Sequence, residues 1–313
     1  RTNDFEKAYN HFKINNELVN ESYGKSVNEK SFIELVTQRI KFFKDFNINR
    51  WKQYQLEDEF FQPIFLIGFP RSGTTLLDTI LRTSQSIEVI EEKPILRNFL
   101  RNLDTKIKNN FNHLENLDKK FIQNMQNIYF KEREQYLENK KTKTVIDKMP
   151  LNIIYIAEIL RFFPNAKFIF ALRNPYDSVL SCFMQQFELN PAMKNFTSLE
   201  SSAILYDLVM KLWTIYKNVF SINCHFIKYE DLVTDFEKST KKIFKFLEID
   251  WSNNTKNFHI TAKKRLNIST PSYNQITSPL YTRSISRWKN YEKEFNGLKN
   301  ILDPWLDEFN YKN

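Results

Sequence analysis

The sequence has few of the residues that build disulfide-rich or metal-binding proteins, and it has no long apolar run. Cys182 and Cys224 are the two cysteines in 313 residues, which excludes a disulfide framework and a spaced cysteine metal cluster. The four histidines show no metal-ligand spacing, so we predict no metal. No stretch approaches the roughly 18 apolar residues of a membrane span, and the polar start of the chain is unlike a signal peptide. We therefore expect a cytoplasmic chain without a membrane segment, and leave open what precedes residue 1.

The charge balance points to anionic ligands. Lysine and arginine number 46 against 37 aspartates and glutamates, a net charge of +9. This excess suits nucleotides, sulfate groups, polysaccharides or nucleic acid, although a solvated basic surface would give the same number. No aromatic-basic signature of an RNA-binding module is present, so we predict no nucleic-acid partner.

Two segments near the start predict helices, because apolar residues recur at helical spacing over residues 4–19 and 31–46. The first is similar to the closing helix of a tetratricopeptide repeat, but one unit does not establish an array, and a plain helical cap fits equally well. We assign residues 1–58 to a helical lead-in and residues 59–313 to a second domain.

The second domain alternates short apolar runs with helical segments. This order predicts an α/β fold with a P-loop-like parallel sheet flanked by helices, and its ligands are expected at the carboxyl ends of the strands. The expected strands are residues 63–68, 144–146, 167–172 and 224–228, each leading into a helix. Residues 104–143 are polar and helix-prone, and we expect them to form an outer helix or an excursion over the site.

The stretch GFPRSGTTLL, from Gly68 to Leu77, follows an apolar strand and opens a helix. Gly68 and Gly73 have the gap of a P-loop, whose backbone N–H groups and helix N-terminus bind phosphate. However, Thr74 stands where a nucleoside triphosphatase has lysine, and a cation comes earlier, at Arg71. This favours a donor with one 5′-phosphate and an adjacent transferable group over a P-loop kinase or nucleotidase. A turn without any ligand is the structural alternative.

The stretch RNPYDSVLS, from Arg173 to Ser181, also follows an apolar strand. Pro175 suits the first turn of a helix, and Asp177 lies where negative charge favours the helix start. Arg173 at the strand end and Ser181 two turns later could hold one phosphate from two sides.

These two stretches resemble the sulfotransferases that use 3′-phosphoadenosine-5′-phosphosulfate (PAPS). PRSGTT matches their 5′-phosphosulfate loop, and the RNP…S spacing matches their 3′-phosphate motif. More narrowly, the chain resembles bacterial sulfotransferases linked to tetratricopeptide repeats, which are similar to tyrosylprotein sulfotransferases. The further matching stretches are residues 87–94, 146–152, 227–233 and 279–292. The resemblance implies transfer of a sulfuryl group from PAPS to an acceptor hydroxyl, with release of the bisphosphate PAP.

The resemblance also implies roles for particular residues. The 5′-phosphate and sulfate would contact the loop residues Arg71, Ser72, Gly73, Thr74 and Thr75, with Arg71 also catalytic. The 3′-phosphate would contact Arg173 and Ser181, and the adenosine would lie along Tyr229, which without the family is a half-buried aromatic. The lysine that the tyrosylprotein branch has near Ser278 is missing here, so this phosphate contact would pass to Arg283.

Two further catalytic roles follow from the same resemblance. Lys148 would neutralise the leaving group. The alternative is that Lys148 has no catalytic role and is a surface lysine before a helix. Glu92 lies 21 residues after Arg71, the separation of the catalytic glutamate in the relatives, and would act as general base. Glu91 is expected to face the opposite way on an extended segment and to be structural. No histidine replaces Glu92, because the relevant stretch reads DKMP.

The acceptor stays open among protein tyrosine, a glycan and a small molecule, and so does a homodimer. A nucleotide-binding module without catalysis is the alternative to an enzyme.

Overall fold

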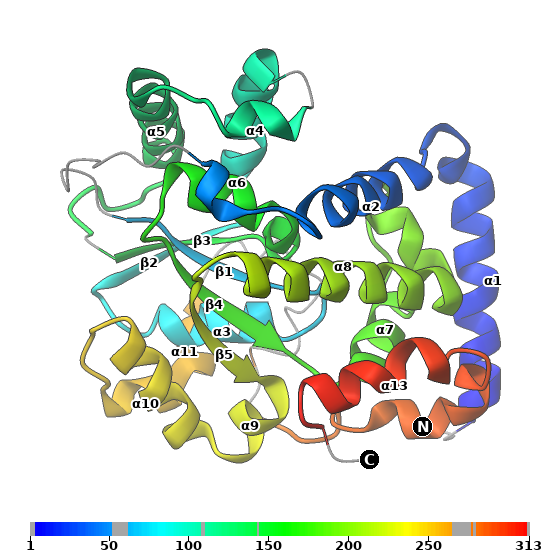
Figure 1. Ribbon diagram of the computed structural model, residues 1–313. Helices are drawn as coiled ribbons and strands as arrows, with labels where there is room; N and C mark the ends of the chain where they lie inside the picture. Colours follow the sequence, from blue (N-terminus) through cyan, green and yellow to red (C-terminus); the bar gives the residue numbers. More distant parts are fainter. Residues whose placement is uncertain are drawn as a thin grey trace.

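Five parallel strands form the centre of the molecule (Figure 1), in the order β2-β3-β1-β4-β5. The computed structural model describes residues 4–51, 62–107, 110–142, 144–264, 277 and 280–311. The strands are β1 Ile64–Gly68, β2 Ile87–Glu91, β3 Thr144–Lys148, β4 Lys167–Leu172 and β5 Asn223–Lys228. The predicted α/β fold with a parallel sheet is therefore confirmed. Strand β2 was expected only as an extended segment, because its two glutamates interrupt the apolar run.

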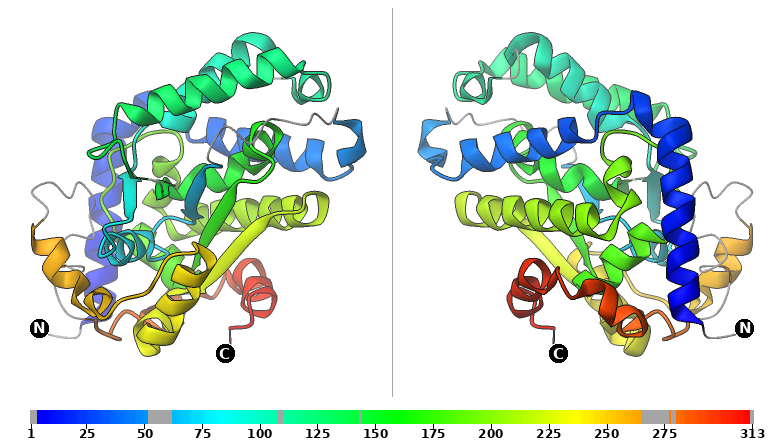
Figure 2. Two further views of the ribbon diagram at one scale, coloured as in Figure 1. Left: turned by 90° about the vertical axis from the view of Figure 1, so that its left-hand side faces the viewer. Right: turned by 90° about the vertical axis from the view of Figure 1, so that its right-hand side faces the viewer.

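Helices cover both faces of this sheet (Figure 1; Figure 2). The α-helices are α1 Phe5–Tyr23, α2 Lys30–Phe43, α3 Thr74–Leu81, α4 Ile95–Ile107, α5 Lys119–Glu134, α6 Ile156–Phe162, α7 Pro175–Phe183, α8 Leu199–Val219, α9 Tyr229–Thr234, α10 Phe236–Phe246, α11 Phe258–Lys264 and α13 Lys299–Glu308. The 3-10 helices are η1 Gly24–Ser26, η2 Ile48–Arg50, η3 Phe111–Leu114, η4 Pro150–Tyr155, η5 Met193–Thr197, η6 Asn253–Asn257 and η7 Arg287–Phe295.

Alternate residues of the strands enter two separate cores. Phe65 and Ile67 of β1 join the larger core with residues of α2, α4 to α8 and α13, whereas Leu66 joins the smaller core with residues of α3, α10 and α11. Successive side chains of a strand point to opposite faces, and a parallel sheet buried on both faces therefore needs continuous apolar strands. The runs PIFLIG and KFIFAL satisfy that need.

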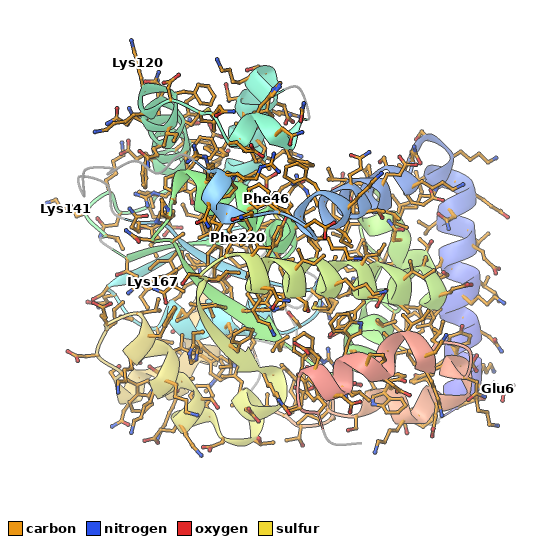
Figure 3. The ribbon with its side chains drawn as sticks, viewed as in Figure 1. Glu6, Phe46, Lys120, Lys141, Lys167 and Phe220 are labelled. Atoms are coloured by element: carbon orange, nitrogen blue, oxygen red, sulfur yellow. The ribbon has the colours of Figure 1, made fainter. Side chains whose placement is uncertain are left out.

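The described part of the helical lead-in is built into the larger core. Helix α2 runs along α8 (Figure 1), and Phe46 lies beside Phe220 (Figure 3) with 6.2 Å between the ring centroids. Arg39 of α2 is buried and pairs with Glu158 of α6. The boundary proposed at residue 58 lies outside the described residues, and a tetratricopeptide origin of the lead-in stays a prediction.

Helix α5 lies at the outside of the molecule (Figure 1), as expected within residues 104–143. It also has an apolar face, because Ile122, Met125 and Tyr129 are buried in the larger core. The Tyr129 hydroxyl, fully buried, donates to Asp147 Oδ2 of β3 at 3.2 Å. The buried apolar residues lie in the turns of α5 before Lys131. The sequence reasoning relied on the polar residues from Lys131 onward and therefore missed them.

Candidate active site

A cavity of about 700 Å³ opens at the carboxyl ends of the strands. Each strand is followed by residues that line it. These residues are Glu92 after β2, Met149–Leu151 after β3, Pro70–Arg71 and Gly73–Leu76 after β1, Arg173 after β4, and Tyr229 after β5. Parallel strands place their carboxyl ends at one edge of the sheet, and this is where α/β folds bind ligands. The cavity volume lies within the range of small-molecule sites.

The loop after β1 has the shape that a phosphate-binding turn requires. Arg71 and Gly73 have left-handed backbone angles, with φ of 67° and 96°. Gly73 also lies against Tyr229, since a Cβ at position 73 would be 2.9 Å from Tyr229 Cδ2. Helix α3 begins at Thr74, and the first N–H groups of a helix have no partner within it. Because Thr74, Thr75 and Leu76 line the cavity, this helix start is suited to an anion there.

Four arginines bring positive charge to the cavity, namely Arg71, Arg97, Arg173 and Arg287. Arg71 Nε donates to Ser181 Oγ at 3.1 Å, while Arg173 donates to the Arg71 carbonyl at 3.0 Å and to the Ser284 carbonyl at 2.8 Å. The Arg173 guanidinium also lies 5.0 Å from the centre of the Tyr229 ring. Burial lowers the pKa of Arg71, and the charges of Arg173 and Arg287 act in the same direction. A bound anion would relieve this mutual repulsion.

The start of α7 holds the C-terminal segment against the cavity. The Asn174 side chain caps the helix, accepting from the Tyr176 amide at 3.0 Å. The Asp177 carboxylate accepts from the Ser286 amide at 2.7 Å and from the Trp288 amide at 2.9 Å. Asp177 therefore does more than favour the helix start, because it fixes the turn that brings Arg287 to the cavity wall.

Two carboxylates converge on one buried ammonium group. Lys148 Nζ lies 2.7 Å from Glu92 Oε1 and 3.0 Å from Glu91 Oε1, and its side chain has no exposed surface. Burial alone would lower the pKa of Lys148, but Glu92, Glu91 and Asp78 outweigh it and raise that pKa. The expectation that Glu91 and Glu92 face opposite ways is wrong. Strand β2 ends at Glu91, and Glu92 has a left-handed φ of 50°, which breaks the alternation.

Glu92 differs from Glu91 in its access to the cavity. Its side chain is 39% exposed and lines the cavity, whereas the Glu91 side chain is 8% exposed. The Glu92 amide donates to the Lys148 carbonyl at 2.8 Å, which fixes the backbone of this turn. Glu92 can therefore reach a bound molecule while Glu91 supports the lysine.

Most of the predicted site residues meet at this cavity. Those that line it are Arg71, Gly73, Thr74, Thr75, Glu92, Arg173, Ser181 and Tyr229. Ser72 is buried and Lys148 lies behind the carboxylates. Arg283 is exposed, with its guanidinium 4.4 Å from the centre of the Tyr281 ring, and it does not line the cavity. Ser278 lies outside the described residues.

Sequence reasoning missed two cations and one wall of the cavity. Arg97 of α4 and Arg287 of η7 line it, as do five residues of the segment that follows α7. Arg283 and Arg287 stand four residues apart in the same matching stretch, and nothing in a single sequence shows which one faces inward. Trp288 lies in η7, packs against the larger core and stacks on Tyr176, with 4.3 Å between the ring centroids.

Within the described residues, no group of three or more histidine, cysteine, aspartate or glutamate side chains is arranged to hold a metal ion. Every helix in the described part of the chain is too short or too polar to cross a membrane.

An α/β sheet with a glycine turn and arginines at its strand ends is suited to a ligand that carries phosphate or sulfate groups. Residues 63–253, more than half of the chain, match the sequence model of the sulfotransferase family. The chain belongs to this family.

Three relatives show how far the likeness extends. A protein-tyrosine sulfotransferase of Drosophila melanogaster is 22% identical over 82% of this chain and 52% of its own length. Protein-tyrosine sulfotransferase A of Caenorhabditis elegans is 25% identical over 72% of this chain and 60% of its own. An uncharacterized protein of Aquifex aeolicus is 25% identical over 99% of this chain, which spans 42% of that protein. The chain thus spans about half the length of these relatives.

Two solved structures share the fold. The sulfotransferase domain of the Synechococcus PCC 7002 olefin synthase gives a TM-score of 0.56 at 18% identity, over 84% of this chain and 100% of that domain. The sulfotransferase domain from the curacin biosynthetic pathway gives 0.56 at 20% identity, over 80% and 98% of the two chains.

Proposed function

We propose that this sulfotransferase takes its sulfuryl group from PAPS and transfers it to an acceptor hydroxyl, with Glu92 as general base. The observation that carries the proposal is that Arg71, Arg173 and Glu92 line one cavity at the strand ends. Two arginines suit the two ends of an anionic donor, and a solvent-accessible carboxylate suits the removal of an acceptor proton. A metal-free mechanism is part of the proposal.

The residues present fit a bisphosphorylated nucleotide. Arg173 Nε is buried and makes no hydrogen bond within the described part of the chain. A buried charged donor without a partner is costly, and a phosphate oxygen would satisfy it. With Ser181, Arg173 would hold the 3′-phosphate, while Arg71, the threonines and the start of α3 would hold the 5′-phosphate and the sulfate. Tyr229, beside Gly73 and Arg173, would lie along the adenosine.

When bound, PAPS supplies a sulfuryl group that leaves the bridging oxygen of its 5′-phosphate for the acceptor oxygen. Glu92 accepts the hydroxyl proton as the acceptor oxygen bonds to sulfur. Arg71 and the backbone amides of the loop would stabilise negative charge on the sulfate and on the departing phosphate, as in phosphoryl transfer. Lys148 holds the Glu92 carboxylate in place at 2.7 Å. Its neutralisation of the leaving group remains part of the proposal.

The acceptor class is the finer part of the proposal. The names of the fly and worm relatives suggest protein tyrosine. Apolar residues also line the cavity near Glu92, among them Met149 and Leu151, and they suit an acceptor with an apolar body. Glycans and small hydroxyl compounds remain alternatives. A kinase would transfer phosphate from ATP, and a binding module would transfer nothing.

Retention on an immobilised adenosine 3′,5′-bisphosphate tests the donor. We expect release by free PAP but not by ATP at the same concentration. Arg283→Ala and Arg287→Ala form a matched pair, because both remove a guanidinium from one turn of the C-terminal segment. Weaker PAP binding in the Arg287 variant alone would assign the phosphate contact to Arg287, and the reverse would support Arg283. Release by ATP as readily as by PAP would contradict the proposal.

A further inference from the structure

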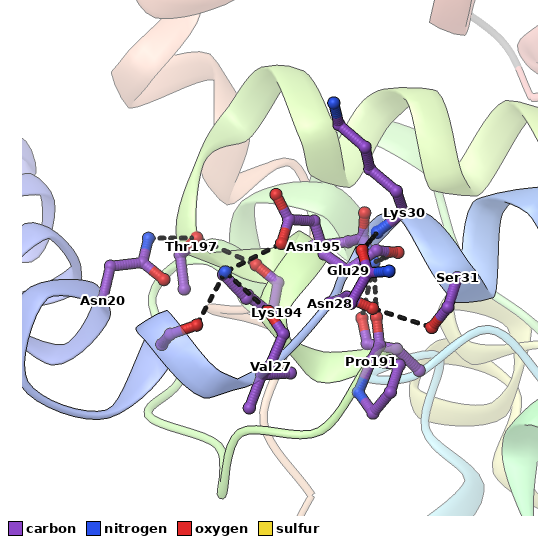
Figure 4. A network of polar contacts seen from close by, with 12 residues as sticks. Asn20, Val27, Asn28, Glu29, Lys30, Ser31, Pro191, Lys194, Asn195 and Thr197 are labelled. Carbon is purple, nitrogen blue, oxygen red and sulfur yellow. Dashed lines mark hydrogen bonds and ion pairs between the residues drawn. The ribbon is translucent and has the colours of Figure 1, made fainter.

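A single lysine joins the helical lead-in to the segment that follows α7 (Figure 4). Lys194 Nζ donates to the carbonyls of Gly24 and Val27, each at 2.8 Å, and pairs with Glu29 Oε2 at 2.8 Å. These three acceptors belong to the connection between α1 and α2. The hydrogen bond from Lys194 lowers the pKa of Glu29. We call Lys194 and its three partners, Gly24, Val27 and Glu29, the Lys194 clamp.

The packing around the clamp leaves little freedom. A Cβ on Gly24 would lie 2.7 Å from Asn20 Oδ1 and 3.4 Å from Lys194 Cε, so the lysine stem passes close over the glycine. Only 17% of the Lys194 side chain is exposed. An ammonium group with three acceptors in a largely buried position is a fixed contact, in contrast to an exposed surface pair.

Other bonds between the same two regions support the clamp. Asn20 Nδ2 donates to Thr197 Oγ1 at 2.9 Å (Figure 4), and the buried Asn195 donates to the Glu29 carbonyl at 3.4 Å. One turn earlier in α1, Asn16 Nδ2 donates at 3.0 Å to the carbonyl of Phe183, the last residue of α7. The lead-in therefore holds the chain at Phe183 and again at residues 194–197.

The residues between these two points form a wall of the cavity. We call residues 184–193 the wall segment. Five of its members line the cavity, namely Gln186, Phe187, Glu188, Asn190 and Met193. Residues 186–190 belong to neither a helix nor a strand, so little regular structure of their own fixes them. Phe187 packs against Phe196, with 5.3 Å between the ring centroids, so the position of the segment depends on this contact and on the anchors at either end.

The composition of the wall segment indicates which part of the site it serves. It contains no lysine or arginine and it carries one carboxylate, Glu188. Such a wall gives no favourable electrostatic interaction with the phosphates or the sulfate of the donor. The donor groups are matched instead by Arg71 and Arg173. The wall segment therefore belongs with the acceptor.

We propose that the Lys194 clamp positions the wall segment, so that acceptor binding depends on a helical lead-in that does not itself line the cavity. This inference rests on the proposed function for its acceptor part only. Lys194 is a positioning residue, because it contacts neither the loop after β1 nor Glu92. Loss of the clamp should free the wall segment while leaving the donor contacts intact.

Lys194→Met tests the clamp, since it keeps the aliphatic stem and removes the ammonium group. The matched control is Lys211→Met, which removes an exposed lysine paired with Asp207 on α8. The first measurement is cleavage after Glu188, an exposed residue, by a glutamate-specific protease under native conditions. We expect cleavage to rise by about tenfold or more in the Lys194 variant, because proteolysis follows the population of open segments. The control should match the wild type.

The second measurement separates acceptor from donor. With PAPS and a tyrosine-containing peptide, Lys194→Met should raise the KM for the peptide about tenfold, while the Kd of PAP changes less than about threefold. If the variant does not fold, Glu29→Gln, which removes one of the three partners, should give smaller changes in the same direction. Unchanged cleavage at Glu188, or equal losses for peptide and PAP, would overturn the proposal. Absence of transfer to this peptide by the wild type would instead count against tyrosine as the acceptor in the proposed function, and the cleavage rates would still decide the clamp.

Discussion

Replacement of Glu92 by glutamine separates catalysis from binding at this site. Glutamine keeps the size of the side chain and its hydrogen-bonding capacity but removes its basicity. Loss of a general base costs about 10²–10⁴ in rate, which corresponds to roughly 3–5 kcal/mol of transition-state stabilisation. PAP affinity should change less than about threefold, or under about 0.7 kcal/mol, because the arginines proposed to hold the phosphates are untouched.

Glu91→Gln is the matched control for this experiment. Glu91 contacts the same ammonium group at 3.0 Å, but its side chain is largely buried and does not line the cavity. Its loss leaves Lys148 paired with Glu92, so the main cost should fall on folding, at about 1–3 kcal/mol for one charged hydrogen bond. Turnover should fall far less than in Glu92→Gln.

The assay is transfer of labelled sulfate at saturating PAPS for both variants, combined with thermal unfolding and PAP titration. The expected pattern is an inactive Glu92 variant with normal PAP affinity, and an active Glu91 variant. Both variants should have a lower melting temperature, because each removes one charged partner of the buried Lys148. An inactive Glu91 variant beside an active Glu92 variant would refute the choice of base. Loss of PAP affinity as large as the loss of turnover in Glu92→Gln would refute its separation from the donor site.

Three further predictions follow from charged groups near and beneath the site. Arg173→Ala should weaken PAP far more than adenosine 5′-phosphosulfate, which lacks the 3′-phosphate; equal weakening in calorimetric titrations would remove Arg173 from that contact. Arg39→Met should lower the free energy of unfolding by about 3–5 kcal/mol by leaving Glu158 buried without its partner, and denaturant unfolding should show much of this recovered in the double variant with Glu158→Gln. Burial raises the pKa of Asp147 to about 7, so the native state keeps a proton there that the unfolded chain loses above about pH 4. The free energy of unfolding should therefore fall as pH rises from about 4 to 7, by an amount on the order of a few kcal/mol, and Asp147→Asn should remove this part of the slope; identical slopes in urea unfolding of the two proteins would contradict it.

The sheet and the glycine turn after β1 could be predicted from the sequence because their signals are local. A continuous apolar run identifies a strand buried on both faces, and glycines before a helix identify the turn that follows it. Strand β2 shows the limit of this reasoning. Its glutamates at positions 88 and 91 interrupt the pattern, since one accepts from the backbone amide of Glu138 and the other contacts Lys148.

The remaining features depend on contacts between distant residues. The left-handed turn at Glu92, which brings both carboxylates to Lys148, is fixed partly by the Lys148 carbonyl, 56 residues away. The Lys194 clamp joins groups up to 170 residues apart. A single sequence gives no signal for such pairs, because neither partner has a distinctive local pattern.

Transfer of labelled sulfate from PAPS to a panel of acceptors tests the central claim most directly. The panel should contain a tyrosine-containing peptide, a glycan and a small phenol, with excess EDTA present and labelled ATP as the alternative donor. We predict label on at least one acceptor class, with PAP released in equal amount, and no such transfer by Glu92→Gln. Transfer of phosphate from ATP, or retention of PAP without transfer to any acceptor, would contradict the account.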